Sequence, residues 1–590
     1  MYESSTSISA HEKLNAHVHF SYLISLHLVC VSPMSVSSVV PSSTTSLSST
    51  TSPNLPTTTI LSSTSIELST SSTSSSHSSL PTTALPSPST PSSNTMARRM
   101  VWKNIATPAA LLQTTFGQPH NILTDMLTSL PKSYIPLAGI RYSHFYDHDT
   151  AIQLTNKANL STYCNLPNIQ SMVLLRDPAY PQQLEANDTT VTIQTWAGRR
   201  KVTPQQYMKS IEISKPHFAV NFHDEIFPEA GHNRTRACVE RCVHWFHDCI
   251  KLHHKSIQTS TSNNTQLLAF LPCITDQELR TKSIQQILDI AKKYNILPTS
   301  DTSQPSSSPL GGFVLGCLGL GENYQQRNST IKQVLSMLPS AGIRVLSGIG
   351  GSGGPADVLA AINQGIDIID SDYPQVLTQY GYASTFIYDI STFLHDTSDT
   401  SSTNHHKRDA NTAELDEHSI DHTNPSKRSN IESSITTNLP SPSRNIPSIV
   451  SSDPTLARKI QQSTAKALQS DITTKINLYD KMYAEDAQPL VSNCLCFACS
   501  GIKAYTDIDH HEYPVPPLRP TKDQRPLQHP GHTRSYVHHL LNTHEMLADV
   551  LLSIHNTYHY AAFFAAIRQA IELNKFTEYS HWFLTKNNLQ

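Results

Sequence analysis

Short apolar runs that alternate with longer helix-like segments constrain the fold of this chain most strongly. Each run has the length of a buried strand, and apolar residues recur at helical spacing in 237–250, 279–294 and 331–338. Regular alternation of strands and helices favours a parallel sheet. The runs are SMVLL (171–175), HFAVNF (217–222), LLAFL (267–271), GFVL (312–315), IRVL (343–346) and IDII (366–369).

The number of these strand–helix units favours a closed (β/α)8 barrel over a short open sheet. Six of them fall within about 200 residues, and the chain leaves room for more before them. In such a barrel the chemistry lies at the carboxyl ends of the strands. The residues expected around this mouth are Asp224, Cys273, Gly316, Cys317, the glycines of 348–354, and Asp370.

Composition divides the chain into folded and unfolded parts. Residues 1–95 are dominated by Ser and Thr, and residues 396–453 are rich in Ser, Asn, His and Asp. Such segments bury too little apolar surface to offset their ordering entropy, so both are predicted to be disordered. The main part of the barrel is predicted at 100–395. Residues 454–580 are predicted to complete it and to carry a metal-binding subdomain, with a loop insertion at 501–530.

The N-terminal segment carries no recognisable targeting signal. Its apolar stretch at 18–41 is too short and too polar to span a bilayer, and it lacks the basic residues of a secretory or organellar leader. We interpret it as an extension ahead of a folded part that begins near Met96 or Met100. The ten cysteines show no pairing pattern typical of disulfides, which suits a reducing cytosol.

Three cysteines lie within six residues near the C-terminus, in a C-x-C-x2-C spacing. Cys494, Cys496 and Cys499 can converge on one tetrahedral cation such as zinc, which then needs one more ligand. With four protein ligands the metal would be structural, because no position remains for water. The candidates for the fourth ligand are the histidines of the following helical segment: His538, His539, His544 and His555.

Three further patterns allow a functional and a structural interpretation. Asp370 ends a strand-like run, where a carboxylate could act as nucleophile or base, or could simply cap a helix. The glycine run at 348–353 matches a dinucleotide-binding motif, but the strand–helix units that should follow are missing, which favours a simple glycine turn. Cys238, Cys242 and Cys249 share a helical face, which favours a buried face over a metal site.

A compact basic triplet is the clearest candidate for nucleic-acid contact. Arg199, Arg200 and Lys201 lie within the stretch WAGRRKVTP (196–204). Because the net charge is only −3, an RNA partner would have to be bound by such local patches. The triplet is either a solvated turn or a contact to RNA phosphates or to the acidic surface of a partner.

Four stretches together resemble the tRNA-guanine transglycosylase superfamily, over roughly residues 100–578. They are WAGRRKVTPQQYM (196–208), GGFVLGCLGLGE (311–322), the run 343–374, and CLCFAC (494–499) with HTRSYVHHLL (532–541) and IHNTYHY (554–560). The resemblance implies a (β/α)8 TIM-like barrel with a C-terminal zinc-binding helical subdomain. It also implies that the zinc ligands are Cys494, Cys496, Cys499 and His555.

Departures from the motifs of the superfamily bear on catalysis. Catalytic members attack the ribose with an aspartate in the motif F-D-C-x-x-P-T-R; Asp370 matches it, but Val376 replaces the arginine. The motif D-S-G-G-F-Q, which carries a second essential aspartate, has no counterpart between residues 100 and 199. The base-binding stretch V-Q-G-G reads LPCI (271–274), and Cys317 replaces the second glycine of a G-G pair. Asp224 is a loose match to a base-binding aspartate.

The resemblance and these departures imply a non-catalytic accessory subunit. It would pair with a catalytic queuine tRNA-ribosyltransferase chain of the same fold and support guanine-to-queuine exchange at the tRNA wobble position. Its own tasks would be dimerisation, tRNA positioning and the binding of one structural Zn²⁺. The alternatives are a self-sufficient transglycosylase with Asp370 as nucleophile and a nucleotide-dependent oxidoreductase. The expected location is the cytoplasm, with peripheral attachment to the mitochondrial outer membrane as a further expectation.

Overall fold

The computed structural model describes twelve stretches of the chain, all within one compact unit at 90–590. Most of the two segments predicted to be disordered, the glycines at 350–353 and the insertion at 502–530 lie outside the described residues. The stretches are 95–127, 137–155, 157, 159–166, 168–175, 185–259, 264–298, 310–320, 322–349, 354–402, 472–501 and 531–589.

A ten-stranded sheet forms the centre of the fold, in the order β3-β14-β13-β12-β11-β10-β7-β6-β4-β5. All neighbours pair in parallel except β4 and β5. Every predicted apolar run overlaps one of its strands. The bounds are β3 (Ala109–Ala110), β4 (Leu112–Thr115), β5 (Gln118–Pro119), β6 (Leu137–Arg141), β7 (Gln170–Leu174), β10 (Phe218–Val220), β11 (Gln266–Pro272), β12 (Leu310–Gly316), β13 (Ile343–Ser347) and β14 (Ile368–Asp370).

One extended segment supplies both ends of the parallel strand order. Only Leu111 separates β3 from β4, and its amide donates to the carbonyl of Ile369 at 2.9 Å. β3 pairs with β14, whereas β4 pairs with β6 on the other side. The series of parallel pairings therefore begins and ends at the same segment, residues 109–115. The predicted mixed α/β class with a parallel sheet is confirmed.

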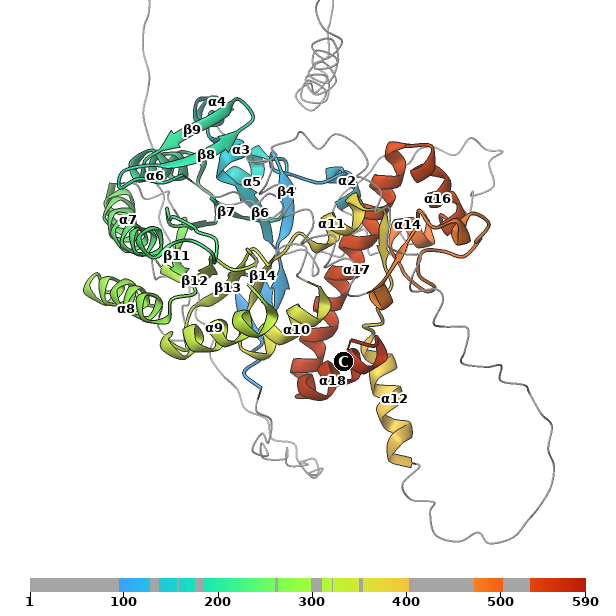
Figure 1. The fold of residues 1–590 in the computed structure, drawn as a ribbon. Coiled ribbons are helices and arrows are strands. Elements are labelled where there is room, and N and C mark those ends of the chain that lie inside the picture. Colours follow the sequence, from blue (N-terminus) through green and yellow to red (C-terminus); the bar gives the residue numbers. More distant parts are fainter. Residues whose placement is uncertain are drawn as a thin grey trace, which may run out of the picture. The chain divides into compact units, whose positions relative to one another are not determined.

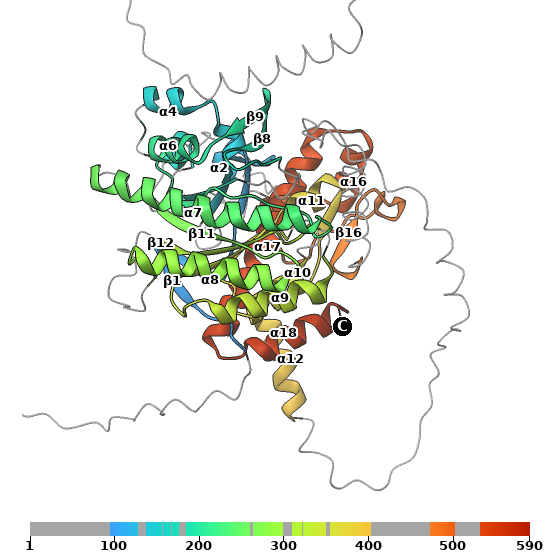
Figure 2. The ribbon, with the colours of Figure 1, turned by 60° about the vertical axis from the view of Figure 1, so that its left-hand side comes forward.

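Helices follow the strands in sequence and cover them from outside. Figures 1 and 2 show α7 to α10 in succession along the strands. Polar caps mark where helices begin: the side chain of Asp276 accepts from the amide of Leu279 at the start of α8. The bounds are α3 (Tyr142–Phe145), α4 (Asp149–Thr155), α5 (Leu160–Tyr163), α6 (Pro204–Ser214), α7 (His232–Thr259), α8 (Gln277–Lys293), α9 (Tyr324–Met337), α10 (Pro355–Asn363) and α11 (Tyr373–Gln379).

The strands are buried on both faces, which explains their continuous apolar runs. Val345 and Ile368 belong to a core that includes Trp102 of the hairpin β1 (Met100–Trp102) and β2 (Ile105–Thr107). Their neighbours Leu346 and Ile369 point to the other face and pack in the larger core with the helices. Because successive side chains of a strand point to opposite faces, each strand contributes side chains to both cores.

The C-terminal part adds helices to the sheet, not strands. Helix α17 packs against α11 and β3, and Arg568 of α17 donates to the carbonyl of Pro108 at 2.8 Å. Of the described residues after Asp370, none joins the ten-stranded sheet; the strands Tyr382–Ser384 and Lys475–Asn477 pair only with each other. The remaining elements are α2 (Thr124–Leu127), β15 (Tyr382–Ser384), α12 (Ile390–Ser402), η4 (Ile472–Thr474), β16 (Lys475–Asn477), η5 (Lys481–Tyr483), α14 (Phe497–Ser500), α16 (Arg534–Asn542), α17 (Met546–Glu572) and α18 (Phe576–Lys586).

Helix α12 continues past residue 396, where the sequence places the start of a disordered segment, and ends at Ser402. Met546 and Leu547 are exposed because they occupy the first turn of α17, where the helix leaves the turn after α16. Leu551 and Ile554, further along the same helix, are buried. Within the described part of the chain, no helix is both long and apolar enough to cross a bilayer.

Candidate functional site

Three cysteines and one histidine converge in the C-terminal part. The sulfurs of Cys494, Cys496 and Cys499 lie 3.8, 3.5 and 3.4 Å from Nδ1 of His555. All four side chains are buried, and their ligand atoms lie within 4.8 Å of one another. This is a set of four donors that could hold one metal ion.

Backbone contacts fix the orientation of the histidine ring. Nε2 of His555 donates to the carbonyl of Ser384 in β15 at 2.9 Å, which leaves the lone pair of Nδ1 facing the sulfurs. The neighbouring Asn556 accepts from the amide of Ser384 at 2.8 Å and donates to the carbonyl of Tyr382 at 2.9 Å. Helix α17 is therefore held against β15 at the level of the cluster.

The other three candidate histidines lie away from the sulfurs. The ring of His538 donates from Nδ1 to the carbonyl of Leu478 at 2.8 Å, and His539 and His544 are exposed. Of the four histidines that the sequence left open, the structure brings only His555 to the cysteines.

Burial disfavours thiolates in the cysteine cluster unless a cation is present. Desolvation raises the pKa of the Cys496 thiol well above its ordinary value, and the adjacent sulfurs of Cys494 and Cys499 raise it further. A divalent cation would offset both effects, because metal ligation stabilises thiolates. The composition of the cluster thus points to a bound metal.

Asp370 is buried at the end of β14, and three side chains donate hydrogen bonds to its carboxylate, one of them the positively charged Arg141. Oδ1 accepts from Nη2 of Arg141 at 3.0 Å and from Nε2 of Gln113 at 2.7 Å, and Oδ2 accepts from the hydroxyl of Ser347 at 3.0 Å. The side chains of Arg141 and Asp370 are 1% and 0% exposed. A carboxylate held in this way is a poor nucleophile, because its charge is already compensated and no reactant reaches it.

The sequence prediction missed Arg141 and Gln113. Arg141 ends the otherwise apolar strand β6, and Gln113 lies in β4 and also accepts from the guanidinium of Arg141. An arginine directly after a buried apolar run is a usable signal, because a buried charge needs a partner. Its partner lies 229 residues away in sequence, however, so the signal does not identify Asp370.

Asp224, the second acidic residue predicted at the strand ends, is also neutralised. Its carboxylate accepts from Arg234 at 2.6 and 2.7 Å and from Arg241 at 3.2 Å, and both arginines come from α7. The side chain of Asp224 is fully buried. Neither acid is therefore free to act on a bound base.

Two rings of the protein pack beside Gly316, the first residue of the pair that corresponds to G-G in the superfamily. The rings of His223 and Phe270 stack at 3.7 Å with an angle of 8°. A Cβ atom at Gly316 would lie 2.0 Å from the ring of Phe270, so that glycine accommodates a ring of the protein itself. Cys317, next along the chain, is buried, and its backbone amide donates to Oε1 of Glu225 at 3.4 Å.

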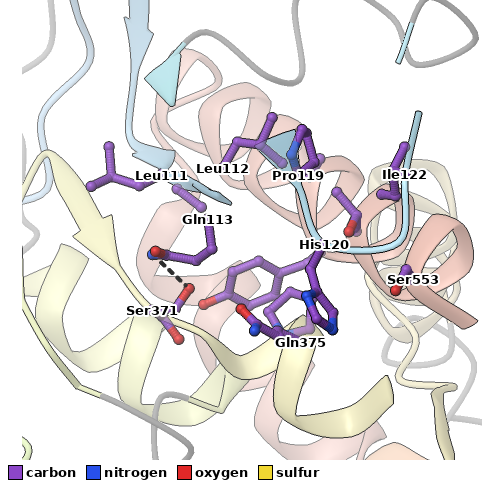
Figure 3. Close-up of a pocket in the computed structure, with 14 residues that line it drawn as sticks. Leu111, Leu112, Gln113, Pro119, His120, Ile122, Ser371, Gln375 and Ser553 are labelled. Carbon is purple, nitrogen blue, oxygen red and sulfur yellow. Dashed lines mark hydrogen bonds between the residues drawn. The ribbon is translucent and has the colours of Figure 1, made fainter. Parts of the chain in front are cut away.

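A pocket lies next to Asp370, between β4, β5, α11 and α17, and Figure 3 shows its lining. Gln113 lines it and donates to the carbonyl of Ser371 at 3.2 Å, as well as to Asp370. Asp370 is not part of the lining. A second cleft reaches Cys273 and Cys317, but neither Asp224 nor Asp370 lines it. Neither pocket brings the two acids together.

The cysteines of α7 form a buried face, as the sequence favours. Cys238, Cys242 and Cys249 are all buried. The thiols of Cys238 and Cys242 donate to the carbonyl of Asp224 at 3.4 and 3.3 Å. In the described part of the chain they belong to no group that could hold a metal.

The basic triplet lies on a hairpin formed by β8 (Val191–Thr195) and β9 (Gly198–Val202). Arg199 and Lys201 are exposed, and Arg199 pairs with the exposed Glu185 at 3.2 Å. Arg200 points to the other face of the hairpin, opposite Ile193. The structure therefore divides the triplet between two faces.

Comparison with known proteins agrees with this architecture. The family model described as "Queuine tRNA-ribosyltransferase" matches residues 96–588. The chain belongs to the queuine tRNA-ribosyltransferase family. The match spans both the parallel sheet and the cysteine–histidine cluster, and it includes the glycine run that suggested an oxidoreductase, so we do not retain that alternative.

Curated relatives of this family cover most of the chain. Proteins named "Queuine tRNA-ribosyltransferase accessory subunit 2" from Xenopus laevis, Gallus gallus and Homo sapiens are 23%, 24% and 22% identical to it. Each alignment covers 80% of this chain, and 90%, 88% and 90% of the respective relative. The chain is thus similar to these accessory subunits over nearly their whole length.

Proposed function

We propose that this chain is the non-catalytic accessory subunit of a heterodimeric queuine tRNA-ribosyltransferase. It supports the exchange of guanine for queuine at the wobble position of tRNA through dimerisation and tRNA positioning. A catalytic chain of the same family provides the reacting groups. The closed parallel pairing supports a (β/α)8 barrel as the common scaffold.

The buried ion pair of Asp370 carries this proposal. A nucleophile must approach the ribose within van der Waals distance in a defined orientation. Here the carboxylate accepts hydrogen bonds from Arg141, Gln113 and Ser347. The ring of Phe270 fills the space beside Gly316. Both the nucleophile and the base site of a transglycosylase are therefore replaced by internal contacts, while the scaffold remains.

The metal of the cysteine–histidine cluster is proposed to be zinc. Tetrahedral bonds of about 2.3 Å to sulfur and about 2.05 Å to nitrogen place each sulfur about 3.6 Å from the nitrogen. The observed distances of 3.8, 3.5 and 3.4 Å to Nδ1 of His555 fit this value. Four protein ligands make the ion structural, and it would tie α17 to the loop that carries the cysteines.

The exposed cations of the β8–β9 hairpin are proposed to contact tRNA phosphates or the partner subunit. Arg199 and Lys201 point to solvent, whereas Arg200 contributes from the opposite face. A cytoplasmic location with peripheral attachment to the mitochondrial outer membrane is proposed as well. Cell fractionation with and without a high-salt wash would test it.

The proposal is tested by base exchange on tRNA with three samples: this chain, the catalytic subunit, and their mixture. We expect exchange only in the mixture. At a temperature at which the variant is folded, Asp370→Asn should leave that activity unchanged, because an amide can still accept from Arg141 but cannot attack ribose. Exchange by this chain alone, lost in Asp370→Asn, would instead establish a self-sufficient enzyme.

A further inference from the structure

The tip of the β8–β9 hairpin exposes an indole ring. Trp196 and Ala197 form the two-residue turn between Thr195 and Gly198, and Trp196 is 60% exposed. Of the other tryptophans, Trp102 and Trp245 are buried and Trp582 is partly buried. The exposed indole on this turn is available to stack on a flat ligand.

The rest of the hairpin is built to hold this tip in place. Val191, Ile193 and Val202 point inward and are buried in the main core. Strand alternation directs Arg199 and Lys201 outward, and the partners opposite them, Gln194 and Thr192, are uncharged. The outer face of the hairpin is therefore cationic and polar, and its inner face anchors it.

The hairpin also lies at the edge of the sheet where Asp370 ends β14. It follows β7 and precedes α6, so it belongs to a connection that starts at the carboxyl end of a parallel strand. Figure 1 shows β8 and β9 beside α4 and α6, away from α14 and α16. A molecule that lies across this edge would reach the tip.

We propose that Trp196 stacks on an unpaired base of the RNA whose phosphates contact Arg199 and Lys201. A flat aromatic ring flanked by cations is the arrangement that proteins use for single-stranded nucleic acid. The inference deepens the proposed function, on which it rests, by assigning the tRNA contact to an unpaired nucleotide. We favour RNA over a protein partner because two outward cations flank the ring and RNA carries a phosphate at every nucleotide.

The test measures tRNA binding by the complex of the full chain with its catalytic subunit. Trp196→Ala should weaken binding of a substrate tRNA about 5- to 100-fold, which corresponds to the loss of one stacked base. Trp196→Tyr should restore most of the affinity, because a ring is present again. A blunt RNA duplex without unpaired bases should bind the wild-type and Trp196→Ala complexes equally.

Two control variants distinguish an effect of base stacking from an effect of charge and from the loss of any exposed apolar side chain. Lys201→Gln should weaken tRNA and duplex alike and reduce the salt dependence of binding, as loss of a phosphate contact does. Met482→Ala removes an equally exposed apolar side chain from η5 and should change neither. Unchanged tRNA affinity in Trp196→Ala would overturn the inference, and so would dissociation of the two subunits in that variant. If the wild-type mixture exchanges no base but its tRNA binding depends on Trp196, the proposed function fails and this inference stands.

Discussion

The ion pair between Arg141 and Asp370 predicts a large and specific stability effect. Both side chains are almost completely buried, and Gln113 and Ser347 complete the hydrogen bonding of the carboxylate. Replacing the arginine by methionine keeps the length of the side chain but removes the charge. The carboxylate is then left buried without its cation, which costs about 3–5 kcal/mol.

A double-mutant cycle distinguishes this effect from a simple loss of packing. Asp370→Asn alone leaves the guanidinium without an anion and should also destabilise. The double variant Arg141→Met with Asp370→Asn has no buried charge, so its cost should be well below the sum of the single costs. The exposed pair of Arg199 and Glu185, replaced by methionine and glutamine, is the matched control and should cost less than about 1 kcal/mol.

Urea unfolding of the zinc-loaded chain, followed by circular dichroism, measures these values. With a slope of about 3 kcal/mol per molar for a chain of this size, Arg141→Met should lower the midpoint by about 1–2 M. The reasoning is refuted if Arg141→Met shifts the midpoint no more than Arg199→Met does. It is equally refuted if the two single costs simply add in the double variant.

Three further changes test other parts of the structure. Cys499→Ser should abolish stoichiometric zinc, measured by elemental analysis, and lower the unfolding temperature; a variant that keeps one zinc per chain would contradict the ligand set. Burial lowers the pKa of His253 from 6.5 to about 4. Between these pH values the unfolded chain binds a proton on this histidine that the folded chain does not bind. The free energy of unfolding therefore falls as the pH drops through this window. His253→Gln should remove up to about 3 kcal/mol of this pH dependence, whereas the exposed neighbour His254→Gln should keep it. Gly316→Ala should destabilise by about 1–3 kcal/mol, because its Cβ would lie 2.0 Å from an aromatic ring, whereas Gly231→Ala has open space and should be nearly neutral in the same unfolding assay.

Much of the fold and part of the site could be predicted from local patterns. The six apolar runs mark strands because strands buried on both faces must be apolar throughout, and this signal needs no knowledge of their partners. The C-x-C-x2-C spacing likewise brings three sulfurs together within one loop. The choice among His538, His539, His544 and His555 could not be made in this way, because it depends on where α17 lies against β15.

The sequence by itself determined the alternation of strands and helices, the three-cysteine loop and the loss of the motif arginine at Val376. These are properties of neighbouring residues, and local geometry fixes them. Only the tertiary structure decided that the carboxylate of Asp370 is buried in an ion pair with Arg141. Its partners Gln113 and Arg141 lie on strands that become neighbours when the segment 109–115 pairs with β14 on one side and β6 on the other. The energy of a buried charge depends on the groups that surround it in space. Here 229 residues of chain separate the aspartate from the arginine that neutralises it.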